Sequence, residues 1–218
     1  RVLLVPDKQG WSIDRIAKAL VRFNIDSSVA LDILPLKGNV RQFLSVEHSY
    51  DLIFLLAYQG YEMLPWWRRR RLIDKRRWLT GIHSHHSWDD GETMPDKDAI
   101  PPTGLIRLLQ RFRGVNAVSP RLTEIFQAAG VNAVCTLNGV NTDEFKPLRP
   151  VSAHGRLKVG FAGTAKGIHD RRKGYTECVV PAVRRADAEL LEAIARTESS
   201  VLPAEMVHFY NQCDVFLL

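Results

Sequence analysis

The sequence has few cysteines and no long apolar run, and both absences limit what the protein can be. Its three cysteines, Cys135, Cys178 and Cys213, are isolated and form no CxxC pair. This excludes a disulfide scaffold and predicts buried or neutral thiols in a reducing compartment such as the cytoplasm. The longest apolar run, Leu52–Ala57, is far shorter than the ~18 residues of a membrane span. No charged and then apolar leader is visible either.

Two common phosphate-binding motifs are also missing. The sequence contains neither the GxxxxGK[ST] spacing of a P-loop nor a GxGxxG dinucleotide fingerprint. With 45% hydrophobic and 25% charged residues among 218, the chain has the composition of an ordinary globular protein of one or two domains. Its net charge of +6 is compatible with an anionic partner.

Short β-rich runs alternate with helical stretches along the whole chain. We expect strands at 2–5, 29–34, 51–56, 79–82, 117–118, 133–137, 157–162, 190–195 and 215–218. We expect helices at 12–23, 40–46, 120–129, 174–185 and 203–213. This alternation predicts an α/β fold with doubly wound parallel sheets.

The chain divides at a polar, proline-containing stretch. The pentapeptide GVNAV occurs twice, at 114–118 and 130–134, on either side of a predicted helix, which indicates a compact strand–helix–strand unit. We expect an N-terminal doubly wound domain over 1–148 and a linker over 149–156. Residues 157–218 then form the first half of a second doubly wound domain.

Four stretches between residue 115 and the end follow a known pattern. They read VNAVSP at 115–120, LNGVNTDEFKP at 137–147, VGFAG at 159–163 followed by Lys173 and Gly174, and MVHFYNQCDVFL at 206–217. In this order they resemble the retaining family 4 glycosyltransferases, which have the GT-B fold of two Rossmann-like domains. The resemblance implies transfer of a sugar from a nucleotide diphosphate-sugar donor to a carbohydrate, lipid-linked or other acceptor, with retention of configuration. The first hundred residues match only in general layout.

The sequence departs from the family pattern in three places. Asn141 stands where the family has Asp, and Thr164 stands where it has Arg. The family's pair of glutamates eight residues apart should follow the strand that ends at Leu218. Because the sequence contains no such pair, we expect the chain to be a fragment and assign catalysis to the intact protein.

The segment after the strand at 157–162 is the predicted donor diphosphate site. Glycine lets the backbone pass close to a ligand, as Gly163 would here. Arg171, Arg172 and Lys173 supply cations beside a helix start at Gly174, where negative charge is favoured. The resemblance implies that Lys173 holds the phosphates and that Arg171 or Arg172 replaces the family's Arg. The alternative is a solvated basic loop. No metal or other cofactor is expected, since these cations oppose the leaving-group charge.

A histidine cluster follows the strand at 79–82. His83, His85 and His86 lie at its carboxyl end, where doubly wound sheets bind ligands. The resemblance implies that His83 contacts the transferred sugar, and His85 and His86 are candidate acceptor contacts. Structural loop histidines and a metal site with Asp89 and Asp90 are the alternatives.

The loop after the first strand contains Gly10 and Trp11. By resemblance, these two residues lie near the acceptor and the donor phosphates. An ordinary strand-to-helix turn explains Gly10 equally well.

The run at 66–78 holds seven cations, one acid and three tryptophans. Basic residues beside interfacial tryptophans suit an anionic membrane surface, which we expect Arg68–Arg77 to contact, making the protein peripheral to the membrane. The alternative is a solvated helix face with its tryptophans turned inward. No nucleic-acid motif is present, and we expect no nucleic-acid partner.

Two other functions stay open. A degenerate GT-B half could bind a nucleotide or glycan without turnover. A metal-dependent hydrolase could use His83, His85 and His86.

Overall fold

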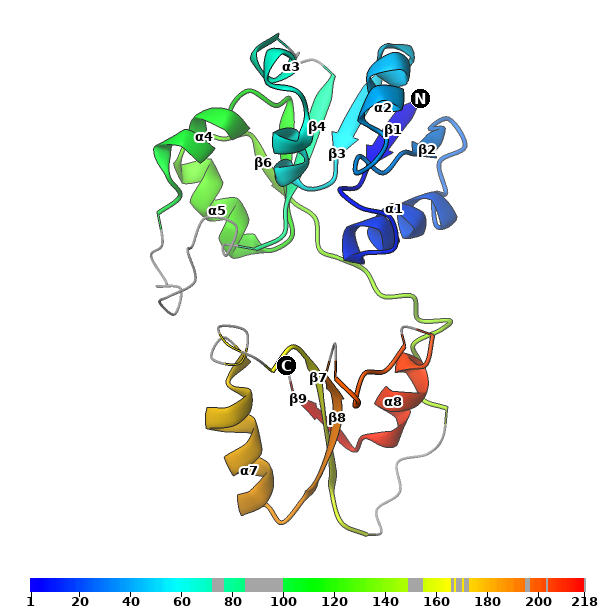
Figure 1. The fold of residues 1–218 in the computed structure, drawn as a ribbon, viewed down its shortest axis with the longest axis vertical. Helices are drawn as coiled ribbons and strands as arrows, with labels where there is room; N and C mark the ends of the chain where they lie inside the picture. Colours follow the sequence, from blue (N-terminus) through cyan, green and yellow to red (C-terminus); the bar gives the residue numbers. More distant parts are fainter. Residues whose placement is uncertain are drawn as a thin grey trace. The chain divides into compact units, whose positions relative to one another are not determined.

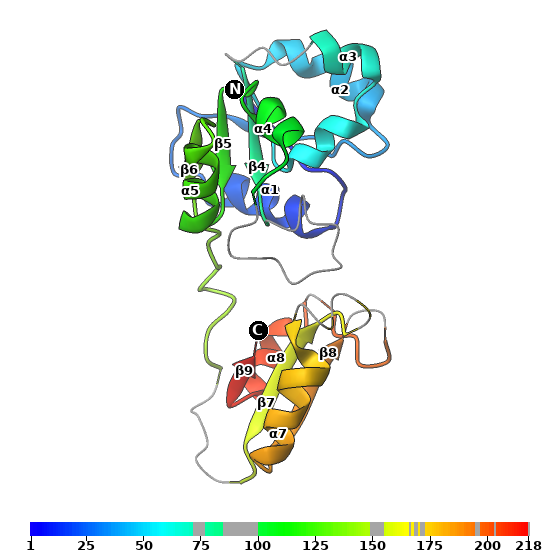
Figure 2. The same cartoon turned by 90° about the vertical axis from the view of Figure 1, so that its left-hand side faces the viewer.

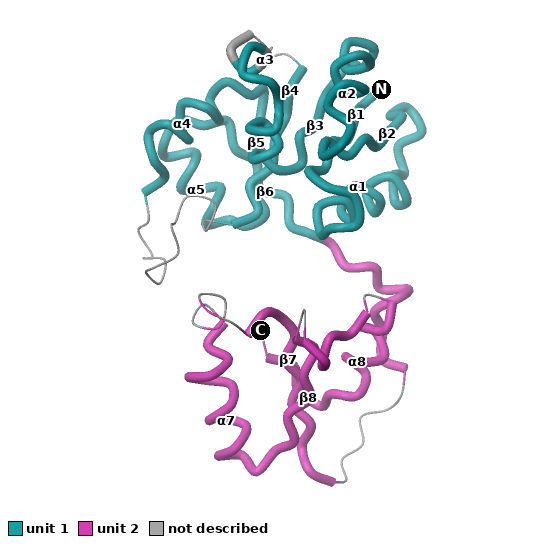
Figure 3. The backbone as a smooth tube through the Cα atoms, in the orientation of Figure 1, with its two compact units in different colours: residues 1–90, 95–138 teal, residues 91–94, 139–218 magenta. Residues whose placement is uncertain are grey.

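The computed structural model describes residues 1–71, 77–84, 100–148, 155–165, 167, 170, 173–194, 197–202 and 204–217. The contacts of these residues form two compact units that meet between Asn138 and Gly139 (Figure 3). We expected the first domain to extend to 148. Asn211 explains the earlier boundary, because its Oδ1 accepts a hydrogen bond from Leu148 N at 2.6 Å and its Nδ2 donates to Lys146 O at 3.1 Å. Most of the predicted linker, 149–156, lies outside the described residues.

The first unit contains a six-stranded, fully parallel sheet (Figure 1). Its strands are β1 (Val2–Val5), β2 (Leu31–Ile33), β3 (Leu52–Leu55), β4 (Trp78–Ile82), β5 (Gly114–Ala117) and β6 (Ala133–Cys135). The order is β2-β1-β3-β4-β5-β6. The direction of strand addition therefore reverses between β1 and β3, as in Rossmann-like folds, and this confirms the predicted α/β class for this unit.

Helices cover both faces of this sheet. They are α1 (Ser12–Arg22), α2 (Val40–Val46), α3 (Trp66–Arg71), α4 (Thr103–Leu109) and α5 (Pro120–Ala128), with short 3-10 turns η1 (Glu47–Ser49) and η2 (Tyr58–Met63). Helix α1 buries Ala17 against Leu4 and Leu56. Helix α2 lies on the other face, where Phe43 packs with Leu3. Neighbouring residues of β1 thus face opposite helix layers, which explains why the strand is apolar throughout.

The second unit contains a three-stranded parallel sheet of order β8-β7-β9. Its strands are β7 (Lys158–Gly163), β8 (Glu189–Ile194) and β9 (Val215–Leu217), and its helical parts are the π-helical turn η4 (Tyr175–Val179), α7 (Val180–Arg185) and α8 (Met206–Gln212). Figures 1 and 2 show α7 and α8 on opposite sides of the sheet. Phe161 of β7 is fully buried and packs with Val179 and Val183. This unit is also Rossmann-like.

The structure bears on one of the two states predicted for the cysteines, buried or neutral. Cys135 and Cys178 are exposed free thiols, so burial does not hold for them. Cys213 is half-buried, and burial, followed by the charge of Asp214, raises the pKa of its thiol. Among the described residues, no helix has both the length and the apolar character that crossing a membrane requires.

A close approach between β3 and β4 generates the first testable prediction. A Cβ atom on Gly81 would lie 2.3 Å from the backbone oxygen of Leu56. We expect Gly81→Ala to lower the free energy of unfolding by about 2 kcal/mol or more, because neither backbone can move freely inside the sheet. Urea unfolding followed by circular dichroism measures this.

Gly104 provides the matched control, since it lies in α4 and a Cβ there would meet no atom within 4 Å. Gly104→Ala should leave stability unchanged or raise it by about 0.5–1 kcal/mol. Equal effects of the two substitutions would contradict the assignment of a tight contact at Gly81.

Candidate functional site

The carboxyl ends of β1, β3 and β4 are joined through one residue. Leu56 follows β3, and its N–H donates to Val5 O of β1 at 3.1 Å. Its carbonyl oxygen lies 2.6 Å from Nε2 of His83, which follows β4. This edge includes the topological switch point between β1 and β3, where doubly wound sheets bind ligands.

His83 is half-buried, and its hydrogen bond fixes which ring nitrogen faces the backbone. Because Leu56 O can only accept a hydrogen bond, Nε2 of His83 must carry the proton that it shares. In the neutral form of the ring, Nδ1 is then an acceptor. Gly81 makes this arrangement possible, since a Cβ there would lie only 3.1 Å from Nε2. The predicted sugar-contacting histidine therefore lies at the expected sheet edge, with Nδ1 as its acceptor atom.

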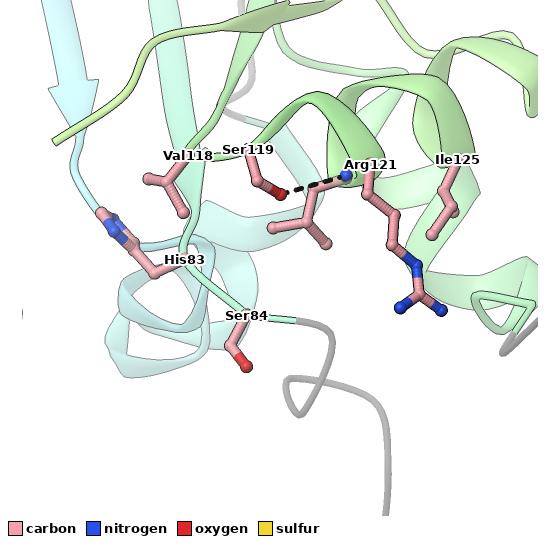
Figure 4. A pocket seen from close by; sticks show the side chains of 7 residues that line it. His83, Ser84, Val118, Ser119, Arg121 and Ile125 are labelled. Carbon is pink, nitrogen blue, oxygen red and sulfur yellow. Dashed lines mark hydrogen bonds between the residues drawn. The ribbon is translucent and has the colours of Figure 1, made fainter. Parts of the chain in front are cut away.

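A pocket of about 350 Å³ opens beside His83 (Figure 4). Its walls come from the ends of β4 and β5 and the first turns of α5: His83, Ser84, Val118, Ser119, Arg121, Leu122 and Ile125. Ser119 caps α5, and its Oγ accepts from Leu122 N at 3.3 Å. Figure 4 shows Arg121 and Ile125 extending from the same helix, with His83 and Val118 across from them. The sequence analysis did not identify Ser84, Ser119 or Arg121 as site residues.

The loop after β1 is held by a buried carboxylate. Asp14 of α1 is 1% exposed, and its Oδ2 accepts from Gly10 N at 2.8 Å and from Lys18 Nζ at 2.7 Å. Gly10 has a φ of +80°, which favours glycine. Trp11 is 48% exposed and Lys8 Nζ lies 4.1 Å from its ring centroid. Gly10 and Trp11 thus lie at the expected edge of the sheet, in a loop fixed by a residue that the sequence analysis missed.

The charge state of Asp14 follows from its partners. Burial alone would raise its pKa, but the hydrogen bonds from Lys18 and Gly10 and the charge of Lys18 outweigh burial and lower that pKa below its ordinary value. Asp14 is therefore a carboxylate at neutral pH, and it holds the Gly10 amide as a charged acceptor.

The second unit brings Gly163 and Lys173 together at the carboxyl end of β7. Gly163 has a φ of +157°, and a Cβ there would lie 2.6 Å from Lys173 Nζ. The ammonium group donates to Ala162 O at 3.3 Å. Gly174 follows in a left-handed conformation with a φ of +61°. Arg171 and Arg172 lie outside the described residues, as do His85 and His86 of the first unit.

A carboxylate already occupies the start of the helix after Gly174. Asp170 accepts hydrogen bonds from Thr176 N at 2.9 Å and from Thr176 Oγ1 at 2.7 Å. These two bonds lower the pKa of Asp170, the backbone bond most strongly. The Thr176 amide is therefore satisfied, and among the described residues Lys173 and the backbone around Gly163 are the groups that an anion at this edge could use.

The basic run at 66–78 is partly structural. Arg77 Nη2 donates to Glu47 O and Tyr50 O, both at 2.7 Å, so this cation is turned toward its own fold. Trp66 and Trp67 are 65% and 49% exposed, which contradicts the alternative in which these two tryptophans point inward. Trp78 is the buried one, at 1%. The side chains of residues 68 and 70–76 lie outside the described part of the chain.

The role of Asp14 is testable through pH. Its lowered pKa contributes stability that is fully present above the unfolded-state pKa of ~3.9 and is lost as pH falls through the folded-state value. We expect Asp14→Asn to reduce the free energy of unfolding at pH 7, and the difference from the wild type to shrink below pH 4. Urea unfolding at both pH values measures it, with the exposed Glu62→Gln as the control. A difference that stays constant with pH would refute the charge-based role.

The described residues contain no group of three or more His, Cys, Asp or Glu side chains that could hold a metal ion, and His85 and His86 were outside that search. Comparison of the sequence with protein-family models gives no match, and comparison with curated proteins gives none either.

Proposed function

We propose that the protein binds a nucleotide diphosphate-sugar and is part of a GT-B glycosyltransferase that transfers the sugar with retention of configuration. One observation carries the proposal: Lys173 lies against Gly163 at the carboxyl end of β7. The family pattern requires a strand, a glycine turn and a lysine–glycine pair that meet there. Two Rossmann-like units, one per predicted domain, support the same assignment.

The chemistry of the site suits a diphosphate leaving group. Negative charge develops on the diphosphate as the glycosidic bond breaks, and a fixed cation stabilises that charge. The Lys173 ammonium has three N–H donors, of which one bonds to Ala162 O. The missing side chain at Gly163 keeps the backbone accessible to a phosphate oxygen.

His83 supplies a different function in this proposal. With Nε2 bonded to Leu56 O, its Nδ1 can accept a hydrogen bond from a hydroxyl group. Sugars present many hydroxyl donors, so a neutral imidazole with one fixed tautomer is suited to orient the sugar or the acceptor.

Removing the Lys173 charge should weaken donor binding. We expect Lys173→Ala to raise the Kd for the best-binding nucleoside diphosphate at least ~10-fold, about 1.4 kcal/mol, because one charge-assisted contact is lost. Isothermal titration with UDP, GDP and ADP measures it. The exposed Lys146→Ala removes the same charge elsewhere in the second unit and should change Kd less than twofold. If Lys173→Ala behaves like Lys146→Ala, the phosphate assignment is wrong.

Incubating the wild-type protein with a nucleotide-sugar distinguishes the transferase from the non-catalytic module and the hydrolase. Release of nucleoside diphosphate from a nucleotide-sugar in the presence of an acceptor supports the transferase, and binding without release supports the non-catalytic module. Stoichiometric metal together with hydrolytic activity would instead support the hydrolase.

The exposed Trp66 and Trp67 favour a second proposal, docking of α3 on an anionic lipid surface. Interfacial tryptophans insert at the headgroup level, and each nearby Lys or Arg adds ~1 kcal/mol of attraction. We expect the chain to sediment with phosphatidylglycerol vesicles at low salt and not with phosphatidylcholine vesicles.

The double variant Trp66→Ala/Trp67→Ala should lose most of that sedimentation. Trp11→Ala removes a tryptophan of the same unit that is as exposed as Trp67, and this variant should retain the sedimentation. Equal binding of both vesicle types, or equal loss in both variants, would contradict the lipid proposal.

A further inference from the structure

The segment that follows β6 contains the one Asn–Gly pair of the sequence, Asn138–Gly139. Both residues are exposed and belong to no helix or strand. Asparagine is chemically labile, and the backbone nitrogen of a following glycine can reach its side-chain carbonyl carbon, because glycine has no Cβ to obstruct the approach. The pair is therefore a candidate for a reaction between its own side chain and backbone.

The surroundings of Gly139 leave this approach open. A Cβ atom on Gly139 would meet no atom within 4 Å in the described part of the chain. Among the residues that the structure describes, none forms a hydrogen bond with the Asn138 side chain or with the Gly139 amide. The two reacting groups are thus free to meet.

The stretch without backbone hydrogen bonds is short and is bounded on both sides. Before it, Thr136 N donates to Ala117 O at 2.9 Å and extends the ladder between β5 and β6. After it, Asn141 O accepts from Phe145 N at 2.8 Å. Between these two bonds, the amides of residues 137–140 make no backbone hydrogen bond to a described residue. Ring closure at Asn138 therefore breaks no contact of a strand or a helix.

Asn132 provides an internal comparison within the same unit. It is exposed too, but its Nδ2 donates to Arg113 O at 2.7 Å, and the next residue, Ala133, is buried in β6. The Ala133 amide donates to Val131 O at 2.8 Å. A reaction between the Asn132 side chain and this amide would break both bonds. Exposure alone therefore does not make an asparagine of this fold reactive.

We propose that Asn138 is a site of spontaneous deamidation in the folded protein. The Gly139 nitrogen loses its proton to hydroxide and attacks Cγ of Asn138. The new C–N bond closes a succinimide ring, and the side-chain nitrogen leaves as ammonia with a proton from water. Water then opens the ring at either carbonyl, which gives aspartate or isoaspartate at position 138. The net reaction consumes one water and releases one ammonia, so it needs no oxidant or reductant.

The products alter the chain where its two compact units divide, between residues 138 and 139. A neutral amide becomes a carboxylate, which is charged at neutral pH. In the isoaspartate product the main chain also runs through the former side chain and is longer by one carbon. Because residues 137–140 hold neither sheet, we expect the urea midpoint of unfolding to stay unchanged in the modified protein. This inference is independent of the proposed transferase function.

The test follows deamidation by peptide mapping and mass spectrometry in the folded and the urea-unfolded chain, at mildly alkaline pH. In the folded chain, we expect Asn138 to react at least ~10-fold faster than Asn132, whose amide must first be released by local opening. Unfolding should accelerate the reaction at Asn132 and change the rate at Asn138 less than ~3-fold. If the fold protects Asn138 as strongly as Asn132, the proposal is overturned.

Gly139→Ala places a Cβ beside the reacting nitrogen and should slow the reaction at Asn138 at least ~10-fold. Gly104→Ala, which removes a glycine from α4, is the control and should leave the rate unchanged. A purified isoaspartate methyltransferase with labelled S-adenosylmethionine should label the peptide that contains residue 138 in aged wild-type protein. Equal rates in the wild type and Gly139→Ala, or an aged peptide without label, would contradict ring closure through the Gly139 nitrogen.

Discussion

The hydrogen bond between His83 and the carbonyl of Leu56 organises the candidate site of the first unit. It joins the ends of β3 and β4, and the Leu56 amide extends the connection to β1. The bond requires Gly81, since any larger residue would meet both the carbonyl and the imidazole. Packing of the two strand ends and orientation of the histidine therefore depend on the same few atoms, so a substitution at Gly81 would disturb both.

The regular elements were predictable because their signals are local. The short apolar run around β3 is typical of a buried parallel strand, and Pro120 and Gly130 bound α5 as expected. The strand expected at 117–118 instead occupies Gly114–Ala117, because the ladder with β4 begins at Gly114. Leu20 has helical spacing with Ile13 and Ala17 but is 41% exposed, whereas Ala17 is fully buried. Helical periodicity alone does not say which turns of a helix are covered by the rest of the fold.

The site was predictable only where chemistry is encoded in adjacent residues. His83, Gly163 and Lys173 stand in short recognisable patterns, and the fold brings the last two into contact. Asp14 and Arg121 are placed by the fold, which brings Asp14 to the Gly10 amide and Arg121 to the pocket at the end of β5. An aspartate in a first helical turn or an arginine after a proline carries no such signal, because both are common on solvated helices. Tertiary packing alone distinguishes these two residues.

The lysine that lies against Gly163 has a consequence for selectivity. Its ammonium donates one of its three N–H groups to the Ala162 carbonyl, which positions the charge beside β7 and leaves two donors for other acceptors. An anion can therefore contact the ammonium without breaking that bond. A ligand with several anionic oxygens could use both remaining donors and the neighbouring backbone together. The resting contact of Lys173 thus positions the cation in advance, which would favour ligands of high charge density at the carboxyl end of β7.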